Sequence, residues 1–226
     1  MFIDACVYGV VVLLKNPFLV GPPVSGEFFF DREELVASLV STVGNNFALI
    51  GMRRTGKTSL VLRLCELFRK KGVIPVVISV KQVTPLTPEN FLKQYSLAAS
   101  KEFLQDAGAV EKLASFFEGK REGFADFLNN LKLTVSIKDV ATIWFEQSST
   151  PKDLSQLVQK TIFFPQSYAL EKKKQVVVFI DEFQDLKEFG PSFLSALREN
   201  MQKTPNVSYV ISGSVVGLIS QIVGEK

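Results

Sequence analysis

Residues 46–58 decide the fold, and they read Asn-Phe-Ala-Leu-Ile-Gly-Met-Arg-Arg-Thr-Gly-Lys-Thr. Residues 46–50 are an apolar run without polar alternation, which indicates a strand buried on both faces of a parallel sheet. Gly51 to Thr58 then follow the pattern G-x-x-x-x-G-K-T, whose glycines let successive backbone N–H groups face one concavity. A helical stripe follows, and the positive end of a helix dipole attracts phosphate. The stretch therefore predicts a strand, a phosphate-binding loop and a helix.

Two side chains of this loop have predicted roles. We expect the Lys57 ammonium to reach the β and γ phosphates of a nucleotide, and the Thr58 hydroxyl to hold Mg²⁺. Arg53 and Arg54 either contact phosphates or a neighbouring subunit, or they lie on solvated surface. The alternative for the whole stretch is a chance glycine-rich turn before a helix.

A second motif lies at residues 176–182, where Val-Val-Val-Phe-Ile is followed by Asp181 and Glu182. Such a strand brings its two carboxylates to the edge of the sheet that carries the phosphate loop. We expect Asp181 to bind Mg²⁺ and Glu182 to polarise an attacking water. The alternative is an exposed acidic turn after a core strand.

A third motif is the strand that ends in Ser212, Gly213 and Ser214. A hydroxyl at that edge could sense a γ-phosphate, although a simple turn from strand to helix explains the same residues. Nucleotide sites that select guanine usually carry an Asn/Thr-Lys-x-Asp element after a later strand. That element does not follow Ile211, so adenine is the expected base.

The composition of the chain excludes several kinds of catalytic and metal site. The chain has 226 residues, 46% hydrophobic and 22% charged, and 26 basic against 23 acidic residues give a net charge of +3, as expected for one globular domain or a domain with an elaboration. It contains no histidine, which excludes Ser-His-Asp and Cys-His catalysis and histidine-bound zinc. Cys6 and Cys65 show no metal or disulfide spacing. We therefore expect a cytoplasmic protein. We expect no membrane helix, because the two long uncharged stretches contain Gly, Asn and Ser.

The remaining pattern predicts an α/β fold with a mainly parallel sheet. Helices are expected at 32–43 and from the phosphate loop to about residue 71, and further buried strands at 73–80, 175–180 and 207–211. Residues 81–174 are too long for a simple crossover, so we expect helices at 88–106 and 151–163 and a hairpin within 131–145. The basic runs 69–71 and 172–174 favour helix ends or sheet edges, with nucleic-acid contact as the alternative.

Four segments together resemble a known family: 22–35, 51–60, 179–185 and 211–214. They are similar to the predominantly archaeal ATPase family of AAA+/STAND-like P-loop NTPases. The resemblance implies a three-layer P-loop NTPase sandwich in which the phosphate-loop strand lies beside the strand ending in Ser212, with the Asp-Glu strand beyond it. It implies ATP and Mg²⁺ as ligands, catalysis by Glu182 and Lys57, and metal binding by Thr58 and Asp181. The implied nucleotide contacts are Gly51, Arg54, Thr55, Gly56, Lys57, Thr58, Ser59, Arg32, Ser212 and Ser214, with Phe30 and Arg32 near the adenine.

The resemblance also implies a division of the chain. We expect an apolar N-terminal extension at 1–20 and an ATPase domain at 21–226, with a variable insertion at 81–174. Family members continue with a helical lid and a winged-helix-like part, so we expect this chain to be a fragment in which turnover is weak.

Three functions fit these residues. The first is an ATPase that uses hydrolysis as a conformational switch, and the second is a nucleotide-gated module that binds DNA or protein with negligible hydrolysis. The third is a structural protein with a vestigial loop. A protein partner or self-association fits the first two, DNA has weaker support, and no membrane partner is expected.

Overall fold

The computed structural model describes residues 6–7, 10–11, 32–41, 43–52, 55–107 and 154–214. In chain order, the elements are β1 (Cys6–Val7), β2 (Val10–Val11), α1 (Glu33–Ser41), β3 (Phe47–Ile50), α2 (Lys57–Lys70), β4 (Ile74–Ser79), η2 (Val80–Gln82), α3 (Pro88–Ala107), α7 (Leu154–Lys172), β5 (Val176–Asp181), η3 (Phe183–Phe189), α8 (Gly190–Met201) and β6 (Val207–Gly213). β1 and β2 form a short antiparallel pair.

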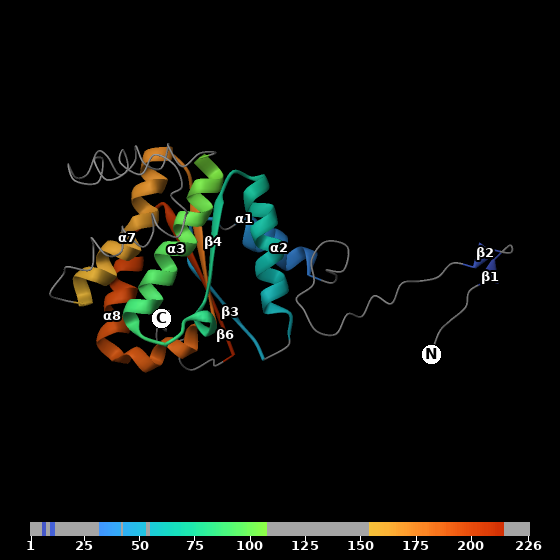
Figure 1. Ribbon diagram of the computed structural model, residues 1–226. Helices are drawn as coiled ribbons and strands as arrows, with labels where there is room; N and C mark the ends of the chain where they lie inside the picture. The colour runs from blue at the N-terminus through green and yellow to red at the C-terminus, as the bar shows by residue number, and fades with distance from the viewer. Residues whose placement is uncertain are drawn as a thin grey trace, which may run out of the picture.

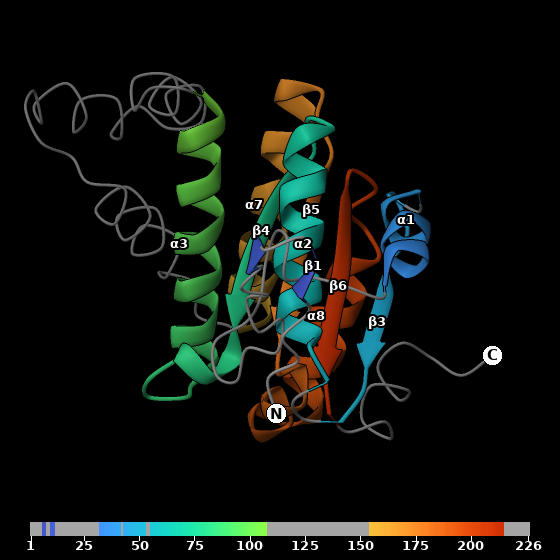
Figure 2. The ribbon, with the colours of Figure 1, turned by 90° about the vertical axis from the view of Figure 1, so that its right-hand side faces the viewer.

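The central sheet has four parallel strands in the order β3-β6-β5-β4 (Figure 2). The strand before the phosphate loop therefore lies beside β6, and the Asp-Glu strand β5 lies beyond it, which confirms the predicted order. The register pairs Leu49 with Ser212 and Ser79 with Asp181. Because all four strands are parallel, their carboxyl ends lie at one edge of the sheet.

Helices cover both faces of this sheet (Figure 1). Side chains alternate between the faces of a strand, so Val177, Phe179 and Val210 pack with α1 and α2. Val176, Val178 and Ile180 pack on the other face with α3, α7 and α8. Since β5 contributes buried residues to both clusters, its uninterrupted apolar sequence is explained, and the predicted three-layer α/β sandwich is confirmed.

The long segment between β4 and β5 carries two of these helices. The hydroxyl of Thr87 accepts a hydrogen bond from the backbone N–H of Asn90 at 3.2 Å, which caps α3 where the sequence predicted a cap. α3 and α7 pack together, with the rings of Phe103 and Tyr168 stacked at 4.0 Å.

The predicted end of the second helix at residue 163 is wrong. α7 continues to Lys172 and contains Pro165 in its interior. Pro165 and Tyr168 are buried against the rest of the core, and this burial outweighs the helix-breaking preference of proline. The predicted hairpin at 131–145, the residues after 214 and all of the predicted N-terminal extension at 1–20 except β1 and β2 lie outside the described residues. No helix in the described ranges is long and apolar enough to cross a membrane.

Candidate functional site

The candidate site lies at the carboxyl edge of the sheet, where β3, β5 and β6 end. β3 leads into the phosphate loop, β5 ends at Asp181, and β6 ends at Gly213. The backbone N–H of Gly51 donates to the Gly213 carbonyl at 3.3 Å, which joins the loop to the end of β6. The structure thus brings together the three motifs that are far apart in the sequence.

The backbone requires glycine at the second glycine position of the loop pattern. Gly56 has φ = 77° and precedes α2, and side-chain-bearing residues rarely adopt this left-handed conformation. At the first glycine, a Cβ atom would lie 3.1 Å from the Thr55 hydroxyl, which itself donates to the Met52 carbonyl at 2.8 Å. The loop is therefore closed by a local hydrogen bond that leaves little space at Gly51.

Lys57 is folded back onto its own loop. Its ammonium donates to the carbonyl oxygens of Gly51 at 2.7 Å and Met52 at 2.8 Å. The amine therefore lies within the loop that is expected to receive phosphate, and its partners are neutral carbonyls. A phosphate is a stronger partner for an ammonium than a carbonyl, so these two bonds can be exchanged for bonds to a nucleotide.

Arg32, predicted near the adenine, lies over the phosphate loop. Its guanidinium donates to the Thr55 carbonyl at 2.5 Å. Atoms of the same group lie 3.7–3.9 Å from the position that a Cβ on Gly56 would take. Arg32 therefore adds a positive charge beside the loop, at the start of α1.

Asp181, the last residue of β5, has contacts to β6, to the next backbone N–H and to α2. Its Oδ1 accepts hydrogen bonds from the Ser212 hydroxyl at 2.5 Å and from the backbone N–H of Glu182 at 3.0 Å. Its Oδ2 lies 3.5 Å from the Thr58 hydroxyl, the donor of that contact. Two donors thus fix one carboxylate oxygen and direct the other toward the first turn of α2.

These oxygens fit a magnesium site. Mg²⁺ prefers oxygen ligands and is usually bound by one or two carboxylates together with substrate phosphates and water. Thr58 and Asp181 supply a hydroxyl and a carboxylate 3.5 Å apart. Within the described ranges, no group of three or more acidic or cysteine side chains could hold a metal on its own, so bound phosphate would have to complete the coordination.

Glu182 occupies a strained position directly after β5. It has φ = 55° and ψ = 42°, a left-handed conformation that costs a residue with a side chain about 1–2 kcal/mol. One carboxylate oxygen, Oε1, forms an ion pair with Lys81 of η2. The other, Oε2, accepts a hydrogen bond from the Gln184 amide at 2.6 Å.

Sequence reasoning did not identify Lys81 or Gln184 as part of this site. Lys81 follows β4 closely, and β4 pairs with β5, so its place at the edge could be inferred only after the strand order was known. Gln184 lies two residues after Glu182 within the segment 179–185, but its contacts depend on the turn geometry of η3.

Three further residues, Ser214, Ser59 and Arg54, were predicted to contact the nucleotide. Ser214 donates its backbone N–H to the Gln184 side-chain oxygen at 3.4 Å. Ser59 is buried in the first turn of α2. Arg54 lies outside the described residues, so its predicted contact stays a prediction.

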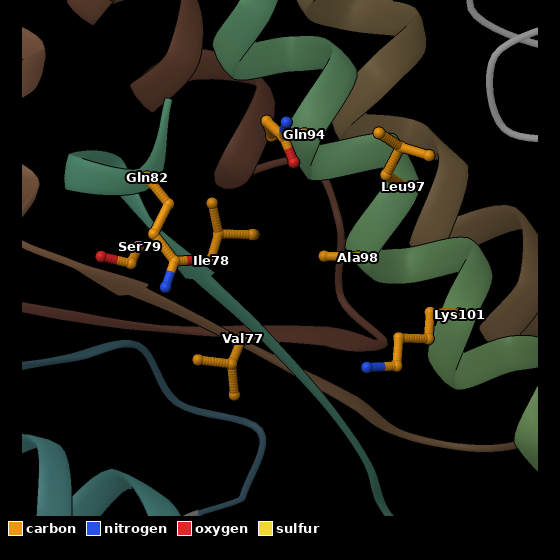
Figure 3. A pocket seen from close by; sticks show the side chains of 8 residues that line it. All are labelled: Val77, Ile78, Ser79, Gln82, Gln94, Leu97, Ala98 and Lys101. Atoms are coloured by element: carbon orange, nitrogen blue, oxygen red, sulfur yellow. The ribbon is translucent and has the colours of Figure 1, made fainter. Parts of the chain in front are cut away.

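A groove of about 390 Å³ opens beside the outer edge of β4 (Figure 3). Residues of α3 line one side and residues of β4 and η2 the other; they are Val77, Ile78, Ser79, Gln82, Gln94, Leu97, Ala98 and Lys101. Ser79 and Gln82 flank the η2 residue Lys81. The side chain of Lys81 is 48% exposed, so the ion pair with Glu182 is open to solvent on the lysine side.

The cysteine of α2 does not provide further chemistry. Cys65 is 3% exposed and packs in the core between α2 and the sheet. Burial raises the pKa of the Cys65 thiol to about 12, although nearby Arg69 lowers it in part. Because the thiolate is the reactive form, Cys65 serves the core rather than a reaction.

Comparisons with known structures find three similar proteins, and the first of them supports this architecture. A Walker-type ATPase of Pyrococcus abyssi matches with a TM-score of 0.53 and 21% identity, covering 92% of this chain and 51% of that chain. The Aeropyrum pernix ORC1 protein in complex with DNA gives a TM-score of 0.45, 17% identity, and coverage of 88% and 41%. The Aeropyrum pernix ORC2 protein in ADPNP-ADP complexes gives 0.47, 12%, and coverage of 87% and 45%.

This chain thus spans about half the length of the Pyrococcus ATPase and a smaller share of the two ORC proteins. No family model matches the sequence, and the comparison with curated proteins gives no match. The match to the Walker-type ATPase shows that this chain shares its α/β fold with the part of that protein that it matches.

Proposed function

We propose that this P-loop domain binds ATP and hydrolyses it to ADP and phosphate in the presence of Mg²⁺, and that the cycle acts as a conformational switch. The observation that carries this proposal is the placement of Asp181. One of its oxygens is fixed by Ser212 and the Glu182 backbone, while the other faces Thr58 at the start of α2. A phosphate loop, a metal-binding hydroxyl and an oriented carboxylate are the parts that phosphoryl transfer needs.

Binding begins with the phosphate loop. The triphosphate would take the Lys57 ammonium from the Gly51 and Met52 carbonyls, and Arg32 would add positive charge on the α1 side. Thr58 and Asp181 would hold Mg²⁺, which supplies charge neutralisation at the β and γ phosphates when bound. These contacts place the γ-phosphate at the edge where Glu182 lies.

Glu182 acts on the attacking water. Its carboxylate would accept a hydrogen bond from water and orient the water oxygen in line with the γ-phosphorus. The new bond forms between that oxygen and phosphorus, and the bond from phosphorus to the β–γ bridging oxygen breaks, with its electron pair leaving on ADP. Both protons of the water end on the phosphate product, and Glu182 accepts the hydrogen bond from one of them during the transfer. Glu182 accepts from Lys81 on one oxygen and from Gln184 on the other, and each oxygen keeps a lone pair with which it can accept from water.

The test combines calorimetry with phosphate release. ATP, ADP and GTP are titrated with Mg²⁺ into the wild-type chain and Lys57→Ala. We expect ATP to bind more tightly than GTP, and Lys57→Ala to weaken ATP binding by at least about 100-fold, because it removes the cation that is expected to bind the β and γ phosphates. Glu182→Gln should keep ATP binding and abolish the phosphate release of the wild-type chain.

Two results would contradict the proposal. Failure of the wild-type chain to bind any nucleotide would remove the site itself. Tight, Lys57-dependent ATP binding without phosphate release would instead favour the nucleotide-gated binding module. Salt-dependent binding of duplex DNA to the ATP-loaded chain would then identify nucleic acid as its partner.

A further inference from the structure

The end of β6 contacts both carboxylates at the end of β5, Asp181 directly and Glu182 through Gln184. Ser212 donates directly to Asp181 at 2.5 Å. Two residues later, the backbone N–H of Ser214 donates to Gln184 at 3.4 Å, and the Gln184 amide nitrogen donates to Glu182 at 2.6 Å. Gln184 therefore links the backbone of Ser214, just after β6, to the side chain of Glu182.

This bridge requires the chemistry of a glutamine. The side-chain oxygen of Gln184 accepts from Ser214 and its nitrogen donates to Glu182, so the amide can satisfy both only in one orientation. A glutamate at this position has no donor for Glu182 and would repel it. Gln184 is 6% exposed, and at this low exposure few water molecules can replace a lost partner.

The backbone at Glu182 increases the need for such a contact. Its left-handed conformation turns the chain directly into η3, where Asp185 donates its N–H to the Glu182 carbonyl at 3.0 Å and Phe183 is fully buried. The backbone is therefore fixed, but the Glu182 side chain still has rotatable bonds. Gln184 holds Oε2 on the β6 side, while Lys81 holds Oε1 on the η2 side.

We infer that Gln184 is a positioning residue for hydrolysis, which fixes the Glu182 carboxylate relative to the end of β6. This inference rests on the proposed function, in which Glu182 orients water. Misplacing a catalytic group by about 1 Å can cost about 100-fold in rate. In the absence of Gln184, the ion pair with Lys81 draws the carboxylate toward η2, and the fraction of Glu182 in the productive orientation falls.

The chain offers a matched control in a second buried, bridging glutamine. Gln166 of α7 is 5% exposed, donates to the Asn206 side chain at 3.1 Å and accepts from the Asn206 backbone N–H at 2.9 Å. Asn206 lies just before β6, at the opposite edge of the sheet. Removing Gln166 therefore removes the same kind of bridge without touching the site.

The experiment measures kcat, KM for ATP and ATP affinity in Gln184→Leu, Gln184→Glu and Gln166→Leu, with thermal unfolding of each. We expect Gln184→Leu to lower kcat at least about 10-fold, with KM and affinity changed less than about 2-fold, because the lost contact orients the base and not the nucleotide. Gln184→Glu should lower kcat further. Gln166→Leu should lower the melting temperature and leave kcat within about 2-fold of wild type.

A double-mutant comparison separates positioning from a general structural effect. In a Glu182→Asp background, which keeps a carboxylate but shortens it away from the Gln184 amide, Gln184→Leu should cause a much smaller loss of kcat than in the wild-type chain, because its effect passes through the contact with Glu182. Folded, ATP-binding Gln184 variants with wild-type kcat, or an equal loss in both backgrounds, would overturn the inference. Phosphate release that does not depend on Glu182 would overturn the proposed function itself, and with it the role of Gln184.

Discussion

Both edges of the sheet carry charged side chains, but the contacts that these side chains make differ between the two edges. At the carboxyl edge, Asp181 has partners from β6, α2 and the adjoining backbone. At the amino edge, the structure pairs charges one to one, as in Lys203 with Glu199, whose side chains are 52% and 66% exposed. The two basic runs of the sequence, 69–71 and 172–174, lie at this second edge, at the ends of α2 and α7.

The difference shows which charges carry information about function. Cations at the last turn of a helix are favoured by the helix dipole and remain hydrated, so they need no further role to explain them. Carboxylates joined by several short hydrogen bonds across three elements are costly to assemble. A functional role accounts for that cost at the carboxyl edge and is not required at the other.

The largest expected effect compares one aspartate at each edge. Asp181→Asn should lower the rate of ATP hydrolysis at least about 100-fold, because it removes the negative charge that faces Thr58 and the expected metal. Asp106→Asn is the control, since Asp106 accepts from the Tyr168 hydroxyl at 3.1 Å and pairs with Lys174. Steady-state phosphate release checks both, and similar losses in the two variants would contradict the comparison.

A second comparison uses two glycines with nearly the same backbone. Gly56 in the phosphate loop has φ = 77°, and Gly72 after α2 has φ = 74°. Alanine at either position should destabilise the fold by about 1–2 kcal/mol through left-handed strain. Gly56→Ala should in addition weaken ATP binding at least about 10-fold, because loop N–H groups have to converge on phosphate. Chemical denaturation and ATP titration measure the two effects separately. Equal ATP affinities of Gly56→Ala and Gly72→Ala would refute the assignment of residues 51–58 as the phosphate-binding loop.

The smallest expected effect concerns an exposed ion pair of the amino edge. Lys203→Met should leave the denaturation midpoint close to that of the wild-type chain, because water and salt screen the pair with Glu199. Any difference between the two midpoints should be smaller in high salt than in low salt. A midpoint lowered as much as that of Gly72→Ala would show that the amino edge contains a cooperative network.

Much of the fold was predictable because its signals are local. The apolar runs 46–50 and 176–180 indicated buried parallel strands, and both are strands of the sheet. Thr87 and Pro88 indicated the start of a helix, and α3 begins at Pro88. The predicted end of α7 was wrong because the helix continues through Pro165, which is buried in the core. A local sequence pattern does not reveal such burial.

For the candidate site too, some features were predictable from the sequence and others depend on the tertiary structure. The sequence by itself determined which residues carry the chemistry, because the loop pattern and the Asp-Glu pair each follow a recognisable strand. Only the tertiary structure decided their partners: Ser212 on Asp181, Lys81 and Gln184 on Glu182, and the loop carbonyls on Lys57. The physical reason is that motifs depend on spacing along the chain, whereas these hydrogen bonds depend on strand order and on the left-handed turn at Glu182, which bring distant residues to one edge of the sheet.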